Sequence, residues 1–216
     1  MNVDELWEQA NQLYDIGEYH AAAGVAENIL VDHHDDPGTR ALLAESLIGQ
    51  FEYEKAETVA KDLLFDCPGW AKAHLILGLI RTRKGWFKAA RLTYEMVLEM
   101  EPDNPEAHGN LCFVYYMMRD YRAAQAYGER AILLAPNSSS ALSLLAGVYL
   151  VQNKHTLGME TYRKAISLNP MNFEAHSNLL FAMELYEGYS LEDIKAERDE
   201  WNLVHAEKFY HARVTN

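Results

Sequence analysis

A period of 34 residues runs through this chain and limits its possible folds more than any other feature. Four prolines recur at this spacing: Pro68, Pro102, Pro136 and Pro170. Because proline cannot continue a helix, each one ends a helix and opens a loop at the same point of the period. A fixed period of this length is typical of helical repeat arrays, in which every unit packs on its neighbours.

The residues at fixed positions of the period indicate how such units would pack. We place the starts of six repeats at Val3, Pro37, Ala71, Pro105, Ser139 and Phe173. Position 20 holds a small residue in five repeats: Ala22, Ala56, Ala90, Ala124 and Gly158. Position 17 holds a ring in all six: Tyr19, Tyr53, Phe87, Tyr121, His155 and Tyr189. Small residues let two helices approach closely, and a ring that follows the turn can pack between one repeat and the next.

Each repeat is predicted to form two amphipathic helices joined by a tight turn. The first helices are expected near residues 3–16, 37–50, 71–84, 105–118, 139–152 and 173–186. The second helices are expected near residues 20–32, 54–65, 88–100, 122–134 and 156–168. Ser190 begins a capping box, which predicts a further helix up to about His211. Its apolar residues would cover the end of the last repeat or, alternatively, dock a partner: Leu191, Ile194, Trp201, Val204 and Phe209.

This pattern resembles the tetratricopeptide repeat (TPR) consensus. The third repeat matches it most closely, through His74, Leu77, Gly78, Ala90, Tyr94 and Pro102. The resemblance covers residues 3–188. It implies an all-α fold, a right-handed superhelix (α-solenoid) of about six helix-turn-helix repeats, followed by a C-terminal capping helix in residues 189–212.

The charge distribution bears on partners and location. The net charge is −13, and residues 1–67 hold 15 acidic residues against three basic ones. Such a field repels phosphate backbones, which argues against nucleic acid. It can attract a basic partner segment, and the alternative is that the acidic residues serve solubility alone. No apolar run approaches the ~20 residues of a membrane span, and the polar start is unlike a signal peptide. We therefore expect a cytoplasmic protein without a membrane partner.

The sequence holds no recognisable catalytic motif, which predicts a protein that is not an enzyme and needs no cofactor. The loop at residues 32–36 contains two histidines and three aspartates, but adjacent loop residues rarely converge on one metal ion. We interpret it as a solvated loop rather than a metal site. His74, His108 and His176 share position 4, which favours packing between helices over catalysis.

The TPR resemblance implies that the first helices line a concave groove through positions 2, 5, 6, 9, 12 and 13. Asn110 and Asn178 share position 6, and an amide can hold a peptide backbone by two hydrogen bonds. Large apolar side chains would lie along the same groove: Phe113, Tyr116, Met117 and Phe181. The third repeat adds Lys72, Leu75, Leu79, Thr82 and Arg83, of which the two cations are candidates for binding a partner. The alternative is that the rings are core between repeats and the amides are merely solvated.

A second resemblance covers about forty residues near the C-terminus. His176-Ser177-Asn178-Leu179-Leu180, Tyr189-Ser190, Trp201 and His205-Ala206 resemble the last TPR and following helix of O-GlcNAc-transferase-type proteins. That family holds substrate peptides with a ladder of asparagines at position 6, which only Asn110 and Asn178 match here. Its glycosyltransferase domain would follow the C-terminal helix, beyond the last residue of this sequence.

The sequence therefore predicts a non-enzymatic scaffold that binds an extended or helical segment of another protein in its groove. One alternative is the substrate-recognition module of a glycosyltransferase system. The other is a self-assembling module, in which the solenoid ends or the C-terminal helix join copies. The oligomeric state and the identity of the partner do not follow from the sequence.

Overall fold

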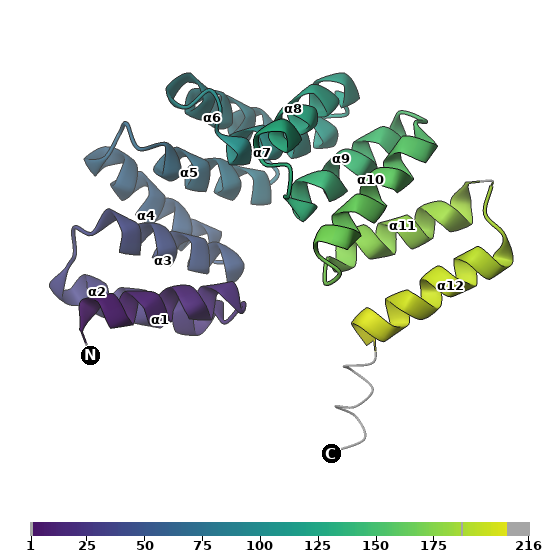
Figure 1. Ribbon diagram of the computed structural model, residues 1–216. Coiled ribbons are helices and arrows are strands. Elements are labelled where there is room, and N and C mark those ends of the chain that lie inside the picture. The colour runs from purple at the N-terminus through teal and green to yellow at the C-terminus, as the bar shows by residue number, and fades with distance from the viewer. Residues whose placement is uncertain (1, 187, 207–216) are drawn as a thin grey trace, which may run out of the picture. The chain divides into compact units, whose positions relative to one another are not determined.

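The computed structural model describes residues 2–186 and 188–206, and its regular elements are all helices (Figure 1). Consecutive helices form antiparallel pairs. The first helices of the pairs are α1 (Val3–Asp15), α3 (Pro37–Gly49), α5 (Ala71–Arg83), α7 (Pro105–Met117), α9 (Ser139–Val151) and α11 (Phe173–Leu185). The second helices are α2 (Tyr19–Asp32), α4 (Tyr53–Asp66), α6 (Phe87–Met100), α8 (Tyr121–Leu134), α10 (His155–Leu168) and α12 (Leu191–Trp201). A π-helical turn, Asn202–Ala206, follows α12.

Every first helix begins at the residue where the sequence repeat begins. Short polar side chains cap several of these starts: the Asp36 carboxylate accepts a hydrogen bond from the Thr39 amide at 2.6 Å, and Asn172 accepts one from Ala175 at 2.9 Å. Among the described helices, none combines the length and the apolar character needed to cross a bilayer. The all-α prediction and the pairing of the helices are confirmed.

A left-handed residue at repeat position 15 closes the turn inside each of the first five pairs. These residues have φ between 61° and 83°: Gly17, Phe51, Gly85, Arg119 and Asn153. The change of backbone conformation ends each first helix one residue before the predicted end. Glycine and asparagine adopt this conformation readily, whereas Phe51 and Arg119 carry side chains that disfavour it.

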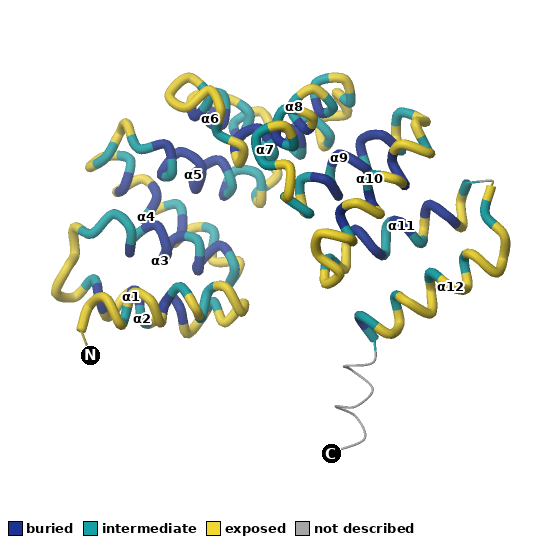
Figure 2. Tube along the Cα trace, viewed as in Figure 1, coloured by how far each residue is buried: buried dark blue, intermediate teal, exposed yellow. Residues whose placement is uncertain are grey.

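The helices group into two compact units, unit 1 (Met1–Asn110) and unit 2 (Leu111–Asn216), and the boundary falls inside α7. In both units the core lies between neighbouring helices, and the small residues of position 20 are buried in it (Figure 2). One core cluster of unit 1 is built from alanine and aliphatic residues of α2 to α5. In unit 2, α9, α10 and α11 pack around Tyr162, Leu179 and Met183.

The histidines at position 4 are structural, as predicted. His74 and His108 are nearly buried, and each bonds through Nε2 to a loop carbonyl at 2.9 Å, that of Pro68 and of Pro102 respectively. His176 is 1% exposed and lies between α11 and the segment that follows it. All three therefore attach a first helix to neighbouring backbone or side chains.

The C-terminal helix begins with the predicted capping box at Ser190 and packs on α11. Trp201 donates a hydrogen bond from its indole to the Ser177 hydroxyl at 2.9 Å, and Ile194 joins the core of unit 2. Leu191 does not cover the last repeat as predicted, because it stands in the first turn of α12 and is 87% exposed. The α-helix ends at Trp201, and the predicted continuation through Phe209 lies outside the described residues.

Candidate functional site

Unit 2 exposes a row of apolar side chains on its first helices. Position 13 contributes Met117, Val151 and Leu185, which are 44%, 40% and 59% exposed, and Phe181 at position 9 is 63% exposed. The helices α9 and α11 are in contact, and Tyr116 of α7 packs into a cluster with α9. We call these residues, with Phe113, Tyr116 and Asn178, the first-helix face of unit 2.

A buried tyrosine anchors Asn178 within this face. The Tyr162 phenol on α10 forms a hydrogen bond with the Asn178 side chain. Burial raises the pKa of Tyr162, with smaller contributions from Tyr116 and Glu174. Gly147 leaves room for this arrangement, because an added Cβ there would lie 3.3 Å from the Tyr162 hydroxyl. Asn178 is thus half-buried and oriented, and part of its hydrogen-bonding capacity is already used.

The other predicted groove residues of α7 differ in their surroundings. Tyr116 is half-buried, and its ring lies 5.9 Å from the Tyr121 ring, so it belongs partly to the core between repeats. Phe113 is also half-buried, whereas Met117 is exposed. Asn110 is half-buried and belongs to unit 1, so the two predicted asparagines do not lie together within one unit.

The cations predicted to line the groove lie in unit 1, at Lys72 and Arg83. The Lys72 ammonium lies 2.5 Å from the Glu45 carboxylate. Burial opposes its charged form, but the bond to Glu45 and the field of Glu106 outweigh this, so the pKa of Lys72 is raised. Arg83 is exposed, and Leu75 is only 4% exposed, which makes its assignment to the groove wrong. Leu75 is buried because it packs in the interior of the helical array.

The sequence reasoning missed two parts of the surface. Val151 occupies position 13 like Met117 and Leu185, so extending the same positional rule to the fifth repeat would have found it. The second part is a pocket at the turns of unit 2, lined by cations that include Arg119 and Arg122. Its signal is the segment Arg119-Asp120-Tyr121-Arg122, where a bulky cation takes the left-handed position.

The side chains on these surfaces are of the kinds that bind other molecules. Apolar side chains, an oriented amide and surface cations can hold a peptide through burial and hydrogen bonds. Among the described residues, no three histidine, cysteine or acidic side chains converge as metal ligands would. His34 and Asp35 of the candidate loop form a pair at 3.2 Å that is mostly exposed to solvent.

Comparisons with known proteins agree with the helical pairs. Two family models described as tetratricopeptide repeat match residues 83–148 and 139–172. No curated protein sequence matches the chain.

Three solved structures share the fold. TTC0263, a thermophilic TPR protein of Thermus thermophilus, aligns with a TM-score of 0.77 and 21% identity over 85% of this chain and all of that one. A chain in the crystal structure of the APC/C hetero-tetramer Cut9–Hcn1 aligns with a TM-score of 0.80 and 12% identity, over 98% of this chain and 45% of that chain. MamA of Desulfovibrio magneticus RS-1, residue 41 to its end, aligns with a TM-score of 0.62 and 19% identity over 82% and 97%.

The paired helices and the exposed first-helix face place the chain in the class of α-helical repeat proteins. The family matches are more specific: residues 83–172 match models of the tetratricopeptide repeat, so this part of the chain is similar to proteins built from such repeats. Proteins of this kind generally mediate contacts between proteins. The resemblance of the C-terminal part to O-GlcNAc-transferase-type proteins stays a prediction.

Proposed function

We propose that this chain is a non-enzymatic interaction scaffold and that the first-helix face of unit 2 binds a segment of another protein. The observation that carries the proposal is the row of exposed apolar side chains on the first helices of this unit, Met117, Val151, Phe181 and Leu185. Single exposed apolar residues are ordinary, but several on adjacent elements are characteristic of interaction surfaces.

The energetics of this face suit the capture of a peptide. Burial of apolar surface stabilises a complex by roughly 25 cal/mol per Å², and aromatic side chains are frequent anchors of interfaces. Because Asn178 is held by Tyr162, its remaining hydrogen-bonding groups are oriented before a partner arrives. Preorganisation of this kind reduces the conformational entropy that binding would otherwise cost.

A solved structure of the same fold supports a role in assembly. The chain that aligns with this one in the Cut9–Hcn1 structure is part of a hetero-tetramer. A fold of this type therefore serves there in a complex of different proteins. We extend only this general role, and not the identity of the partner, to the present chain.

Selection from a random peptide library tests the proposal. The purified protein is immobilised and a phage-displayed library of random 16-residue peptides is selected on it. Affinities of the enriched peptides are then compared between wild type and the double variant Phe181→Ala/Leu185→Ala. We expect at least about a tenfold loss, because two exposed anchors of the face are removed.

A matched control uses a phenylalanine and a leucine that are exposed outside the face. Phe65 on α4 and Leu133 on α8 are 87% and 70% exposed. The variant Phe65→Ala/Leu133→Ala should change the same affinities less than about twofold. Failure to enrich any peptide, or equal losses in the two double variants, would contradict the proposal. Light scattering at tens of micromolar, recorded in parallel, would show whether the face instead joins copies of this chain.

A further inference from the structure

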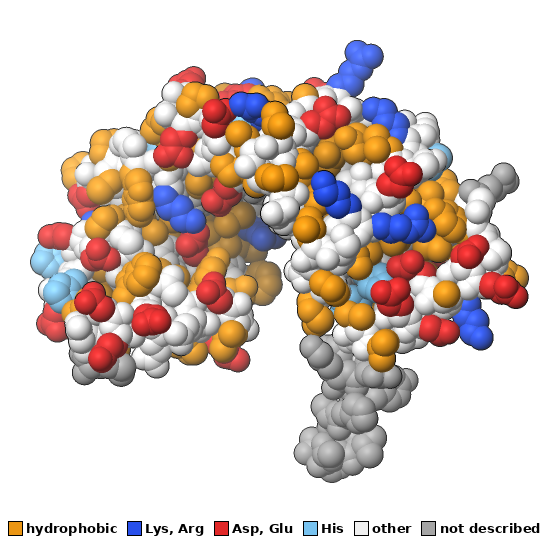
Figure 3. Space-filling view, in the orientation of Figure 1, with side chains coloured by type: hydrophobic (Ala, Val, Ile, Leu, Met, Phe, Trp, Pro, Cys, Tyr) orange, Lys and Arg blue, Asp and Glu red, His pale blue; other side chains and the backbone are white. Residues whose placement is uncertain are grey.

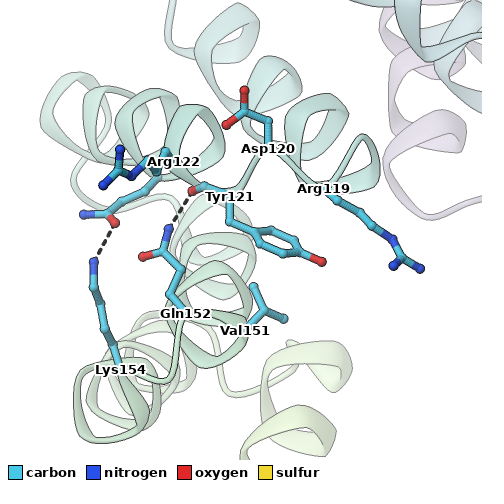
Figure 4. Close-up of a pocket in the computed structure, with 8 residues that line it drawn as sticks. Arg119, Asp120, Tyr121, Arg122, Val151, Gln152 and Lys154 are labelled. Carbon is cyan, nitrogen blue, oxygen red and sulfur yellow. Dashed lines mark hydrogen bonds between the residues drawn. The ribbon is translucent and has the colours of Figure 1, made fainter.

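An open pocket lies at the turn edge of unit 2, beside the first-helix face. Its volume is about 610 Å³. The α7–α8 turn with the start of α8, and the α9–α10 turn, line it with Arg119, Asp120, Tyr121, Arg122, Gln125, Val151, Gln152 and Lys154. We call it the turn-edge pocket. Figure 4 shows Arg122 and Lys154 on one side of Tyr121, and Arg119 extending from the other side.

The pocket carries more positive than negative charge. Its one carboxylate, Asp120, caps α8 by accepting a hydrogen bond from the Ala123 amide at 3.1 Å. Lys154 donates to the neutral Gln125 side chain at 2.6 Å. Within the described part of the chain, no ion pair joins a carboxylate to Arg119 or Arg122. In a protein of net charge −13, two exposed guanidinium groups thus remain available to an outside anion.

Arg119 occupies a backbone position that disfavours its side chain. Its φ is 62°, and the equivalent positions of the first, third and fifth repeats hold glycine, glycine and asparagine. Strained residues of this kind are enriched at ligand-binding sites. Here the guanidinium of such a residue lies beside the pocket.

The pocket is continuous with the first-helix face. Val151 belongs to both, and the ring of Tyr121, which lines the pocket, lies 5.9 Å from that of Tyr116 on the face. The floor is fixed, because Gln152 donates a hydrogen bond to the Tyr121 carbonyl at 2.6 Å. A single bound segment can therefore contact apolar side chains and the cations at once.

We propose that the turn-edge pocket binds aspartate or glutamate side chains of the protein segment whose apolar residues occupy the first-helix face. This inference rests on the proposed function and adds the chemical character of the partner: apolar residues followed or preceded by acidic ones. The planar guanidinium of arginine matches the two oxygens of a carboxylate. The basic partner expected from the acidity of residues 1–67 concerns unit 1, and the unit 2 segment has the opposite charge.

The peptide selection described above tests the inference by the composition of what it enriches. The enriched peptides should carry net negative charge and at least one large apolar residue. Raising the salt concentration from about 50 to about 500 mM should weaken their binding several-fold, because salt screens exposed charges. Enrichment of neutral or basic peptides would overturn the inference while leaving the proposed function in place.

Two double variants of equal charge change locate the effect. Arg119→Ser/Arg122→Ser removes the cations of the pocket, whereas Lys164→Ser/Lys195→Ser removes two exposed cations that do not line it. We expect about a tenfold loss of affinity for an enriched acidic peptide in the first variant and less than about a twofold loss in the second. Equal losses would mean that net charge alone attracts the peptide, and would overturn the assignment to the pocket.

The single variant Arg119→Gly separates binding from folding. Glycine suits the left-handed backbone, so the variant should be at least as resistant to urea as wild type. Its affinity for the acidic peptide should nevertheless fall about threefold or more. Unchanged affinity in a folded Arg119→Gly variant would show that Arg119 is not part of the site.

Enrichment of peptides that depend on Phe181 and Leu185 but not on Arg119 and Arg122 would overturn this inference and leave the proposed function in place. Failure to enrich any peptide would count against both proposals.

Discussion

Units 1 and 2 are built from the same repeat but differ in the charge and polarity of their surface residues. Unit 1 carries a net charge of −11 and unit 2 a net charge of −2. Figure 3 shows acidic side chains spread over the visible face of α1 to α4. Two cations of unit 1 are paired with carboxylates of the same unit, Lys84 with Glu57 at 2.9 Å and Lys72 with Glu45.

The difference between the surfaces of the two units is clearest at repeat position 13. Unit 1 has Asp15, Gly49 and Arg83 there, whereas unit 2 has Met117, Val151 and Leu185. The side chains at this position are exposed in both units. Gly49, which has no side chain, lies beneath the ring of Tyr19. The comparison teaches that the buried positions of a repeat maintain the fold, while its outward positions can differ in charge and polarity without disturbing it.

The interiors also differ, although both are closely packed. In unit 1 the Tyr94 ring lies over Gly78, and in unit 2 Gly128 faces Cys112 and Leu145. The glycine that lies under a larger side chain is therefore on the first helix of its pair in α5–α6 and on the second helix in α7–α8. The following predictions use such matched positions, beginning with the largest expected effect.

Gly78→Ala should destabilise the protein far more than Gly128→Ala. An added Cβ at Gly78 would overlap the ring of the fully buried Tyr94, which cannot move without disturbing the core. We expect a loss of about 3 kcal/mol in the free energy of unfolding, measured by urea titration. At Gly128 the nearest atoms are the end of Leu145, at 2.9 Å, and the Cys112 sulfur, at 3.0 Å.

For Gly128→Ala the better helix propensity of alanine offsets much of the strain, so we expect a change below about 1 kcal/mol. As a control, Tyr94→Leu in the Gly78→Ala background should recover part of the loss. Equal destabilisation by the two glycine substitutions would show that both interfaces are packed alike.

High pH should destabilise the protein through its buried phenols. Burial raises the pKa of Tyr94 in unit 1 and of Tyr162 in unit 2. The folded state keeps these protons while the unfolded chain loses them above a pH of about 10, so stability present below this pH is lost as the pH rises. Each tyrosine should contribute a fall of about 1.4 kcal/mol per pH unit above about pH 10.

Chemical denaturation between pH 8 and pH 11 (about three units) measures this effect. The variants Tyr94→Phe and Tyr162→Phe should each reduce the fall, with their own stabilities at pH 8 as reference. If only one of them does so, the phenols of the two units are not equally shielded from water.

Lys72→Ala should affect stability but not peptide binding. Its ammonium is engaged with Glu45, so its loss leaves that carboxylate without its cation. We expect a loss of about 1 kcal/mol in the free energy of unfolding, since the pair is partly exposed. A double-mutant cycle with Glu45→Gln isolates the pair. A loss of peptide affinity beyond about twofold would instead place Lys72 at the binding surface, as the sequence predicts.

Phe51→Gly should stabilise the protein slightly. Phe51 has φ of 64° and is 76% exposed, so its removal relieves backbone strain with little loss of burial. We expect the free energy of unfolding, measured by thermal denaturation, to rise by about 0.5–1 kcal/mol. The gain is no larger because glycine has greater freedom in the unfolded chain. Asn153→Gly is the matched control in unit 2 and should change stability less. A destabilised Phe51→Gly variant would indicate that the contact between the Phe51 and Tyr53 rings, whose centroids are 6.3 Å apart, stabilises the fold by more than the backbone strain costs.

Much of the fold was predictable because the same residue types recur at the same positions of each repeat, so that each repeat packs in the same way. The starts of the first helices, the burial of the small residues at position 20 and the structural role of His74, His108 and His176 all follow from recurrence. The site was less predictable. Leu75 shares an outward-facing register with Lys72 but is buried, and Leu191 shares the apolar character of Ile194 but is exposed. Hydrophobic pattern alone cannot separate such cases, because exposure depends on what packs opposite.

The sequence by itself determined the class of fold, because the period, the prolines and the small residues restrict how successive helices can pack. Tertiary structure decided which outward positions are open. It paired Lys72 with Glu45, tied Asn178 to Tyr162, and left Met117, Val151, Phe181 and Leu185 exposed. It also brought together the turn-edge pocket from two turns that lie about one repeat apart. Local sequence sets helix and turn, whereas the availability of a side chain depends on neighbours that are distant in the chain.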